Sequence, residues 1–451
     1  MKQGMIETYE DNQLVVAIPD LAVVRGALTE RAVGVAAEQR DKRLGLALLT
    51  LQDLAARTAD LRSGDGGLAG RANQTRRPAS PPGAIKPSDL DLLLGWLREH
   101  FRSAYAGWVP TMGKNRVLDP VRGFPYVDGG GQGDPYFGGR GDPRSSSGEN
   151  GGTSAGTPGP SPAPPGWPRR PASPGQGVRV GVLDTRLYPN EWLAGGYVAA
   201  AHDLLQAPAA GSSPRPASAG HATFIAGLIL RRAPGAELVI RPVLNEQALG
   251  RTWDVARDLV GFIGSGVDVL NLSFGCYTDD GEPPLVLARA VSLVSAEILL
   301  VAAAGNHGDI DELRAKGALA DTPGTRGLTS VTPMWPAAFD EVIAVGATDG
   351  NNKLAPFSPQ TPWVDMTAPG VDVESTYLTG EVKLASPRRG SPTATFSNGF
   401  AYWDGTSFAA AAVSGAVAAK TRPGRRDARR ALARICESPE CGIRPYTKPG
   451  S

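Results

Sequence analysis

The chain has 451 residues, of which 46 are Lys or Arg and 45 are Asp or Glu, so that its formal net charge is +1. This balance gives no overall attraction to nucleic acid or to anionic lipid, and we expect neither as a partner. No apolar run reaches the ~18 residues that a membrane-spanning helix needs, and the N-terminus lacks the apolar segment of a secretory signal. We therefore expect no membrane span and a cytoplasmic location.

Residues 1–108 predict a small α+β region. Apolar runs of strand length lie at Leu14–Ile18, Val33–Ala36 and Leu44–Leu49, and the last two flank a charged turn at Glu38–Arg43. Helical spacing of apolar residues is found at Leu21–Ala32, Leu51–Leu61 and Asp89–Tyr105. No partner for this region is indicated by its residues.

The next segment, residues 109–177, predicts a linker. Between residues 129 and 177 there are 15 Gly, 10 Pro and 6 Ser in 49 positions. Such a composition buries too little apolar surface to offset the entropy that is lost when the chain becomes ordered. We therefore expect a disordered Gly/Pro/Ser linker between two folded parts.

From residue 178 the sequence alternates between apolar strands and helices. Strand patterns lie at Arg179–Asp184, Glu237–Val243, Asp268–Phe274, Ile298–Ala304 and Val342–Ala347, and helical patterns at Trp253–Ile263, Leu285–Val294 and Arg425–Ile435. Apolar strands that alternate with helices are typical of a parallel sheet covered on both sides. We expect an α/β domain over residues 178–438, followed by a tail at 439–451.

Four polar residues of this domain stand where strands end or helices begin. Asp184 and Asn306 each close an apolar strand, and functional groups of parallel sheets gather at such carboxyl ends. His221 and Ser407 each precede a helix-compatible run. Taken singly, each residue has a structural alternative as a cap, a turn residue or a core histidine. Their joint occurrence favours a catalytic set, because a serine needs an adjacent base to become a nucleophile.

The stretches around these residues resemble the subtilisin-like serine proteases, the S8 peptidase family. The matching stretches are VGVLDT at Asp184, GHATFIAG at His221, DVLNLSFG, VAAAGN at Asn306, WPAAFDEVIAVGATD, FSPQTPWVDMTAPG and DGTSFAAAAVSGAVA at Ser407. Their order differs from that of an α/β-hydrolase, in which the serine comes first, within G-x-S-x-G. The resemblance implies a three-layer subtilisin-like fold with a mostly parallel central sheet.

The resemblance also implies a serine endopeptidase that works through an acyl-enzyme intermediate. Asp184, His221 and Ser407 would form the catalytic triad, and the Asn306 side chain and the Ser407 backbone N–H would form the oxyanion hole. Three positions depart from the family pattern: Arg186 and Ala222 stand in place of glycines, and Ala411 in place of a proline. None removes a reacting atom. Arg186 and Ala222 support the alternative, a catalytically inactive binding module with the subtilisin fold.

By the same resemblance, a polypeptide substrate would bind as an extended strand. Its backbone would pair with the segment Ser273, Phe274 and Gly275, and the primary specificity pocket would have Ala303, Ala304 and Gly305 as its opposite wall. Because the residues of that wall are small, we expect room for a sizeable substrate side chain.

The proposed chemistry requires no cofactor. Structural calcium is common in the family, but no calcium or other metal ligand set is found in the sequence, and Cys276, Cys436 and Cys441 form no metal-binding pattern. A Cys436–Cys441 disulfide stays open, although a reduced compartment is expected. The first 60 residues resemble the family's inhibitory propeptide, and an interaction domain is the alternative.

Overall fold

The structure is a computed structural model, and it describes residues 2–3, 6–63, 87–120, 174–206, 213–317, 319, 324–388, 391–423, 427–439 and 442–447. Most of the predicted linker, residues 121–173, lies outside these ranges, and so does Cys441. Within the described part of the chain, no helix is both long and apolar enough to span a bilayer.

Ten α-helices and twenty strands are formed by the described residues. The helices are α1 (Leu21–Glu30), α2 (Leu54–Arg57), α3 (Ala59–Ser63), α4 (Asp89–Ala104), α5 (His221–Arg232), α6 (Thr252–Val260), α7 (Leu285–Val294), α8 (Ile310–Ala315), α9 (Thr406–Lys420) and α10 (Ala428–Glu437). The strands are β1 (Lys2–Gln3), β2 (Thr8–Ala17), β3 (Gly34–Asp41), β4 (Leu46–Gln52), β5 (Met112–Pro120), β6 (Arg179–Asp184), β7 (Tyr197–Val198), β8 (Arg215–Pro216), β9 (Glu237–Pro242), β10 (Gly250–Arg251), β11 (Val269–Leu272), β12 (Phe274–Gly275), β13 (Leu299–Ala303), β14 (Val342–Thr348), β15 (Met366–Pro369), β16 (Val373–Thr376), β17 (Gly380–Arg388), β18 (Ser391–Phe396), β19 (Phe400–Trp403) and β20 (Arg444–Pro445).

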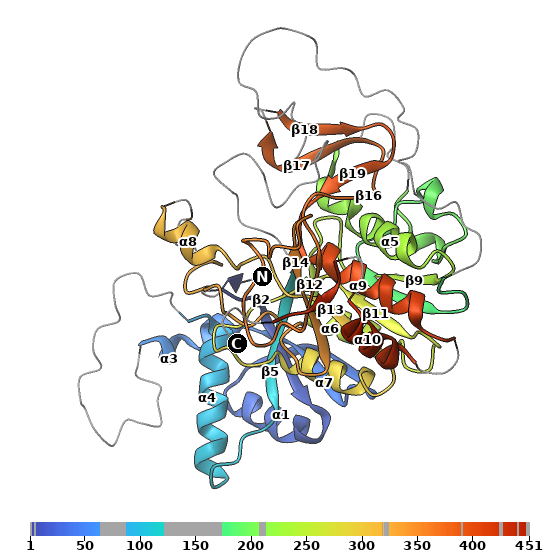
Figure 1. The fold of residues 1–451 in the computed structure, drawn as a ribbon. Coiled ribbons are helices and arrows are strands. Elements are labelled where there is room, and N and C mark those ends of the chain that lie inside the picture. Colours follow the sequence, from blue (N-terminus) through green and yellow to red (C-terminus); the bar gives the residue numbers. More distant parts are fainter. Residues whose placement is uncertain are drawn as a thin grey trace.

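An eight-stranded sheet lies at the centre of the second part of the chain (Figure 1). Its strand order is β20-β15-β14-β13-β11-β6-β9-β7, and each neighbouring pair is parallel except β15 with β20. Strands β11 and β13 are buried along their whole length, as expected for a parallel sheet with helices on both faces. The predicted mostly parallel sheet is therefore observed.

Side chains from the two faces of this sheet enter two separate apolar clusters. Val180 and Val182 of β6 pack in the cluster that contains residues of α5 and α9. Leu183, the next residue of β6, packs in the cluster that contains residues of α6 and α7. The period-two alternation of the strand thus sends its side chains to opposite faces.

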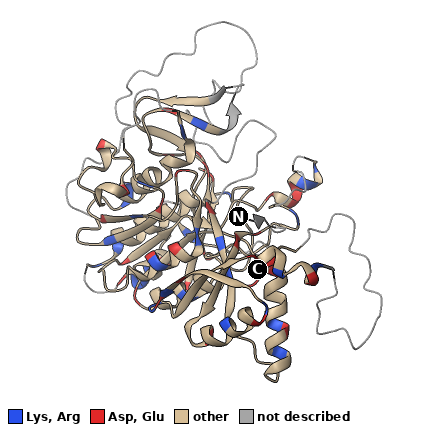
Figure 2. Ribbon diagram, turned by 180° about the vertical axis from the view of Figure 1, so that it is seen from behind, with Lys and Arg blue, Asp and Glu red and all other residues tan. Residues whose placement is uncertain are grey.

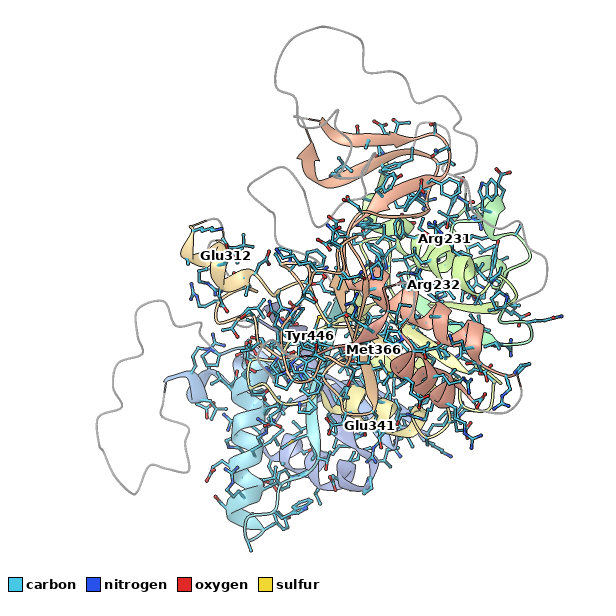
Figure 3. The ribbon with its side chains drawn as sticks, in the orientation of Figure 1. Arg231, Arg232, Glu312, Glu341, Met366 and Tyr446 are labelled. Carbon is cyan, nitrogen blue, oxygen red and sulfur yellow. The ribbon has the colours of Figure 1, made fainter. Side chains whose placement is uncertain are left out.

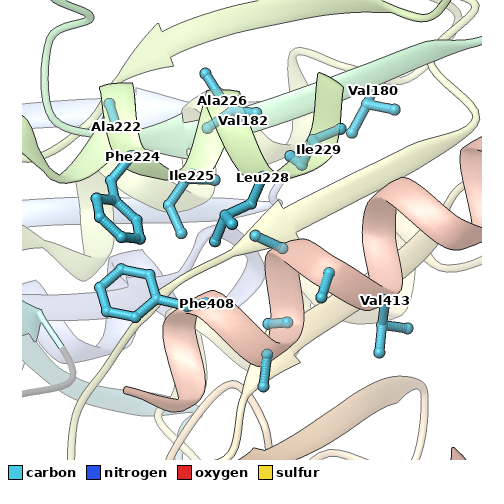
Figure 4. Close-up of a cluster of buried hydrophobic side chains, with 14 of the residues drawn as sticks. Val180, Val182, Ala222, Phe224, Ile225, Ala226, Leu228, Ile229, Phe408 and Val413 are labelled. Carbon is cyan, nitrogen blue, oxygen red and sulfur yellow. The ribbon is translucent and has the colours of Figure 1, made fainter. Parts of the chain in front are cut away.

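Helices α5 and α9 pack closely through a pair of aromatic rings and through a glycine. Figure 4 shows Phe224 of α5 facing Phe408 of α9, and the centroids of the two rings are 4.5 Å apart. Further along, a Cβ atom added to Gly415 would lie 2.9 Å from the carbonyl oxygen of Ile229. A glycine is therefore required there for the helices to approach, and this packing positions the first turn of both helices.

The N-terminal region forms an antiparallel sheet in which β2 lies between β4 and β5, with β3 beyond β4. Helices α1 and α4 contact β2 and bury their apolar faces in a third cluster with it. Helix α4 begins at a capping box, in which the Ser88 and Asp91 side chains each accept a hydrogen bond from the other residue's backbone N–H.

Strand β5 corrects the predicted linker, which was placed from residue 109. It pairs with β2 on the N-terminal side and with both β10 and β12 on the other. Its cationic residues are paired within the fold: Arg116 is 7% exposed and its Nε lies 2.9 Å from Glu7 Oε2, while the partly buried Lys114 pairs with Glu7 and Asp91. The linker therefore begins after Pro120 at the earliest.

Two smaller predictions for the N-terminal region also differ from the structure. The turn predicted at Glu38–Arg43 is shorter, because β3 runs to Asp41. The single helix predicted at Leu51–Leu61 is replaced by the end of β4 and by the short helices α2 and α3. Positions of Lys or Arg and positions of Asp or Glu are interspersed along the described ribbon (Figure 2).

Candidate active site

Asp184 is the last residue of β6 and lies at the carboxyl end of the parallel sheet. Its side chain is fully buried, and Oδ1 accepts a hydrogen bond of 2.7 Å from the backbone N–H of Thr185. A buried carboxylate is stable only when hydrogen-bond donors surround it. The main further donor is an imidazole.

That imidazole belongs to His221, the first residue of α5. Its Nδ1 lies 2.8 Å from Oδ2 and 2.9 Å from Oδ1 of Asp184, and the residue is 4% exposed. Because an ionised carboxylate only accepts hydrogen bonds, Nδ1 carries the proton and Nε2 is left with a free lone pair in the neutral ring. The rings of Trp403 and Phe408 lie 5.6 and 5.7 Å from the imidazole and fix its plane.

Ser407 is the second residue of α9, directly before Phe408 in the ring cluster around His221. It is 2% exposed, and its Oγ has no hydrogen-bond partner among the described residues. A buried hydroxyl without a partner is uncommon in a structural role, because its desolvation is then uncompensated. Its place at the start of a helix also surrounds it with backbone N–H groups.

Asn306 follows β13 and is held by the residue before the serine. Its Oδ1 lies 3.0 Å from the backbone N of Thr406 and 3.1 Å from Thr406 Oγ1. Since a backbone N–H can only donate, the contact with the Thr406 N–H assigns Oδ1 to this side and turns the Nδ2 group to the other. A Cβ atom added to Gly405, the residue before α9, would lie 3.5 Å from that Nδ2.

The two predicted walls of the substrate cleft both contact the Thr406–Ser407 segment. On one side, Ser273 Oγ lies 3.2 Å from the backbone oxygen of Ser407. On the other, the backbone N–H of Gly305 donates to Thr406 Oγ1 over 3.1 Å. Ala303 and Ala304 lie behind Gly305, and both are fully buried next to β14.

A strand of the N-terminal region occupies the edge that was predicted to bind substrate. Phe274 and Gly275 pair with Pro120 and Asp119 of β5 in antiparallel register. The preceding residues of β5, Val117 and Leu118, pair with β10. The backbone groups of this edge are therefore suited to an extended peptide.

A second histidine, His307, lies next to Asn306 and is fully buried. Its Nε2 lies 2.9 Å from the carbonyl oxygen of Thr332, which can only accept, so that Nε2 carries the proton and Nδ1 accepts from the Tyr277 hydroxyl over 3.0 Å. Burial lowers the pKa of His307 to about 4. The sequence motifs gave no indication of this pair.

No cluster of three or more His, Cys, Asp or Glu side chains suited to a metal ion occurs among the described residues. Structural calcium stays a prediction. Cys276, beside the substrate edge, is buried, and burial raises the pKa of its thiol to about 12.

Two elements of the site were missed by sequence analysis. Thr406 orients Asn306, and the DGTS stretch placed it beside the serine without indicating this contact. A polar chain from Ser414 of α9 through Asn271 to Ser273 supports the Ser407 backbone, with hydrogen bonds of 3.0 and 2.9 Å. The N-x-S spacing in DVLNLSFG was the available signal.

The structure thus brings together Asp184 and His221 at the carboxyl edge of a parallel sheet, and Ser407 lies in the first turn of the neighbouring helix α9 without a hydrogen bond from its Oγ to the imidazole. The model of the subtilase family, Peptidase_S8, matches residues 175–424. The chain therefore belongs to the subtilase family and is classed as a serine-type peptidase, a hydrolase with a subtilisin-like fold.

Similar curated proteins carry protease names. The thermophilic serine proteinase of Bacillus sp. (strain AK1) is 33% identical over 210 residues, which is 46% of this chain and 41% of that protein. Subtilisin BL of Lederbergia lenta is 33% identical over 215 residues, 45% of this chain and 67% of that protein. The crystal structure of a lanthipeptide protease matches 58% of this chain and 81% of its own with 24% identity and a TM-score of 0.44. The matched part thus covers less than half of the first relative.

Proposed function

We propose that the chain is a serine endopeptidase with Ser407 as nucleophile, His221 as general base and Asp184 as its orienting carboxylate. The observation that carries this proposal is the buried contact of His221 Nδ1 with both oxygens of Asp184. It fixes the tautomer in which Nε2 is able to accept a proton. The membership in the subtilase family supports the same assignment.

In the proposed reaction, Ser407 Oγ attacks the carbonyl carbon of the scissile bond as its proton passes to His221 Nε2. The imidazolium is stabilised by Asp184, and the carbonyl oxygen becomes an oxyanion. Collapse of this intermediate breaks the C–N bond, and His221 returns the proton to the leaving amine. A water molecule then attacks the acyl carbon as its proton passes to His221 Nε2. The ester C–O bond breaks, His221 returns the proton to Ser407 Oγ, and the acid product leaves.

The oxyanion would be stabilised by Asn306 Nδ2 and by the backbone N–H of Ser407. The support for this is that the backbone N–H of Thr406 donates to Asn306 Oδ1, which directs the amide nitrogen to the opposite side. A donor that is fixed before the reaction needs no reorganisation when the charge develops. Thr406 is thus a positioning residue of the proposed oxyanion hole.

We propose residues 178–438 as the peptidase domain, with helices on both faces of its sheet in a three-layer arrangement. The substrate would be a polypeptide, bound as a strand along Phe274 and Gly275, and no cofactor enters the proposed steps. The inactive binding module is disfavoured by the surroundings of Ala222 and Arg186. Ala222 is buried with its backbone N–H on Thr185 Oγ1 at 3.2 Å, and Arg186 is exposed, so that neither displaces the Asp184–His221 pair.

A second proposal concerns the N-terminal region, for which an inhibitory role is favoured over recruitment. Strand β5 occupies the edge on which a substrate would have to pair, and a strand already bound there competes with it. Leu118 of β5 is fully buried in the apolar cluster that residues of α6 and α7 share with Val15 of β2 and Leu46 of β4, and this burial holds the strand in place.

The catalytic proposal is tested by a fluorophosphonate probe, which reacts with activated serines. We expect one labelled residue, Ser407, and loss of both labelling and casein hydrolysis in Ser407→Ala. The change removes one oxygen from a helix start and costs about 1 kcal/mol of stability at most. Ser292→Ala, an exposed serine on α7, is the control and should label as the unmodified chain does. Casein hydrolysis at the unmodified rate by Ser407→Ala would refute the assignment.

The inhibitory proposal is tested by loosening β5. Leu118→Asp places a charge in an apolar cluster and should raise the initial rate of peptide hydrolysis by the full chain. Val23→Asp, at a 38% exposed position of α1 in the same region, is the matched control and should leave the rate unchanged. Equal rates for all three chains would favour a recruitment role.

A further inference from the structure

Each of the two walls proposed beside Ser407 contains a glycine: Gly275 is the last residue of β12, and Gly305 follows the end of β13 at Ala303. Gly275 ends the wall that contacts the Ser407 backbone through Ser273, and Gly305 ends the wall that contacts Thr406. In the proposed function, the side chain of the substrate residue that supplies the attacked carbonyl lies between these walls. We call this substrate residue the acyl residue.

One side chain of the protein already lies between both glycines, that of Met334. A Cβ atom added to Gly275 would lie 2.9 Å from both Cγ and Cε of Met334, and one added to Gly305 would lie 3.2 Å from its Sδ. Met334 is 2% exposed. The thioether therefore lies close to the backbone of both walls. A Cβ atom at Gly275 would crowd Met334, and one at Gly305 would in addition lie 2.6 Å from the His307 ring.

The segment that carries Met334 is fastened to both walls. On one side, Cys276 and Trp335 exchange two backbone hydrogen bonds of 2.8 and 3.0 Å, directly after Gly275. On the other side, the His307 ring binds the carbonyl oxygen of Thr332 over 2.9 Å. Because Thr332 and Trp335, on either side of Met334, are both held by hydrogen bonds, the Met334 backbone has little freedom to move away from the two glycines.

We infer that Met334 limits the primary specificity pocket to a small acyl residue, such as Ala, Ser or Gly, an inference that rests on the proposed serine-peptidase function. A larger side chain between the walls would have to displace the thioether from a packed site, which is the overpacking that close-packed interiors resist. This reverses the expectation from sequence, in which the small residues Ala302–Gly305 left room for a sizeable side chain. The wall is small, but Met334, distant in the sequence, fills the space it leaves.

The inference is tested with internally quenched peptides that differ only in the acyl residue, Ala or Phe, and with diphenyl phosphonate probes that carry the same two side chains. The full chain should show a kcat/KM at least tenfold higher for Ala than for Phe, and the probes should show the same order of labelling rates. Met334→Ala should raise the Phe-to-Ala ratio at least tenfold, because it removes the group that excludes the ring.

Met366→Ala is the matched control, since Met366 is also a 2% exposed methionine but lies in β15, next to Cys436 (Figure 3). It makes the same truncation, and its Phe-to-Ala ratio should equal that of the unmodified chain. The ratio is independent of how much protein is folded, so a loss of stability does not affect the comparison. An unmodified chain that prefers Phe, or a Met334→Ala ratio that does not change, overturns the inference while Ser407 labelling upholds the proposed function. Absence of both hydrolysis and Ser407 labelling overturns both.

Discussion

His307 makes the stability of the peptidase domain depend on pH in a window that the structure defines. Its pKa is lowered to about 4 by burial, while the hydrogen bond to the Thr332 carbonyl opposes this shift. In the unfolded chain an imidazole has a pKa of about 6.5. Between these two values the unfolded state binds a proton that the folded state excludes, so the free energy of unfolding falls as the pH is lowered from about 6.5 towards 4.

The magnitude follows from the same two pKa values. A shift of about 2.5 units corresponds to about 3 kcal/mol over the whole window, and about 2 kcal/mol of this is lost between pH 7.5 and pH 5. The reason lies in the ring's contacts: protonation of Nδ1 removes the acceptor for the Tyr277 hydroxyl, 3.0 Å away, within a dry site. Above pH 7 the contribution is constant.

The measurement is urea unfolding at pH 7.5 and pH 5.0, in a Ser407→Ala background that prevents self-digestion. Between pH 7.5 and pH 5.0, the free energy of unfolding should decrease by about 2 kcal/mol less in His307→Gln than in the parent chain, because glutamine does not titrate. His202→Gln, at a histidine whose side chain is 83% exposed, should behave as the His307 chain does and controls for the loss of a histidine in general. If the His307→Gln chain has the same pH dependence as its parent, the buried neutral imidazole is not what couples stability to pH.

The other predictions concern the catalytic machinery and the linker. Asp184→Asn should lower kcat by a factor on the order of 10⁴, as in trypsin-type enzymes, with KM nearly unchanged in steady-state assays. Asn306→Ala should lower kcat by about 10²–10³, the loss known for such a donor in subtilisin, and a smaller effect would remove Asn306 from the oxyanion hole. Thr406→Val should lower kcat less than Asn306→Ala, because the amide stays but loses one of its two orienting donors. Brief digestion with an added protease should cut within residues 129–177 and release a stable C-terminal fragment, as mass spectrometry of the products would show.

The sequence was most informative where a local pattern decides the position of a side chain. Asp184 ends a strand of continuous apolar residues, and His221 begins a helix of apolar residues. In a parallel sheet these two places adjoin, and the structure brings the two side chains to 2.8 Å. Neither position depends on a distant segment for its secondary structure, which is why the motif predicted both.

The sequence was least informative where burial depends on partners far along the chain. Strand β5 contains Lys114 and Arg116, charges that suggest a solvent-exposed segment. Arg116 is buried and Lys114 is partly buried against Glu7, more than 100 residues away, whose carboxylate offsets the cost of desolvating them. Met334 is similar, since nothing near it in the sequence indicates the two glycines between which it lies.

The three departures from the family pattern show how the site tolerates change around fixed reacting atoms. Ala411 lies in the middle of α9, which runs without interruption from Thr406 to Lys420, and alanine provides the backbone donor that a proline lacks. Ala222 directs its methyl group into the core, and Arg186 extends towards solvent at the end of β6. None of the three side chains therefore lies between the residues of the proposed triad. The Asp184–His221 contact, on which the proposed catalysis depends, is made entirely by atoms that the departures leave in place.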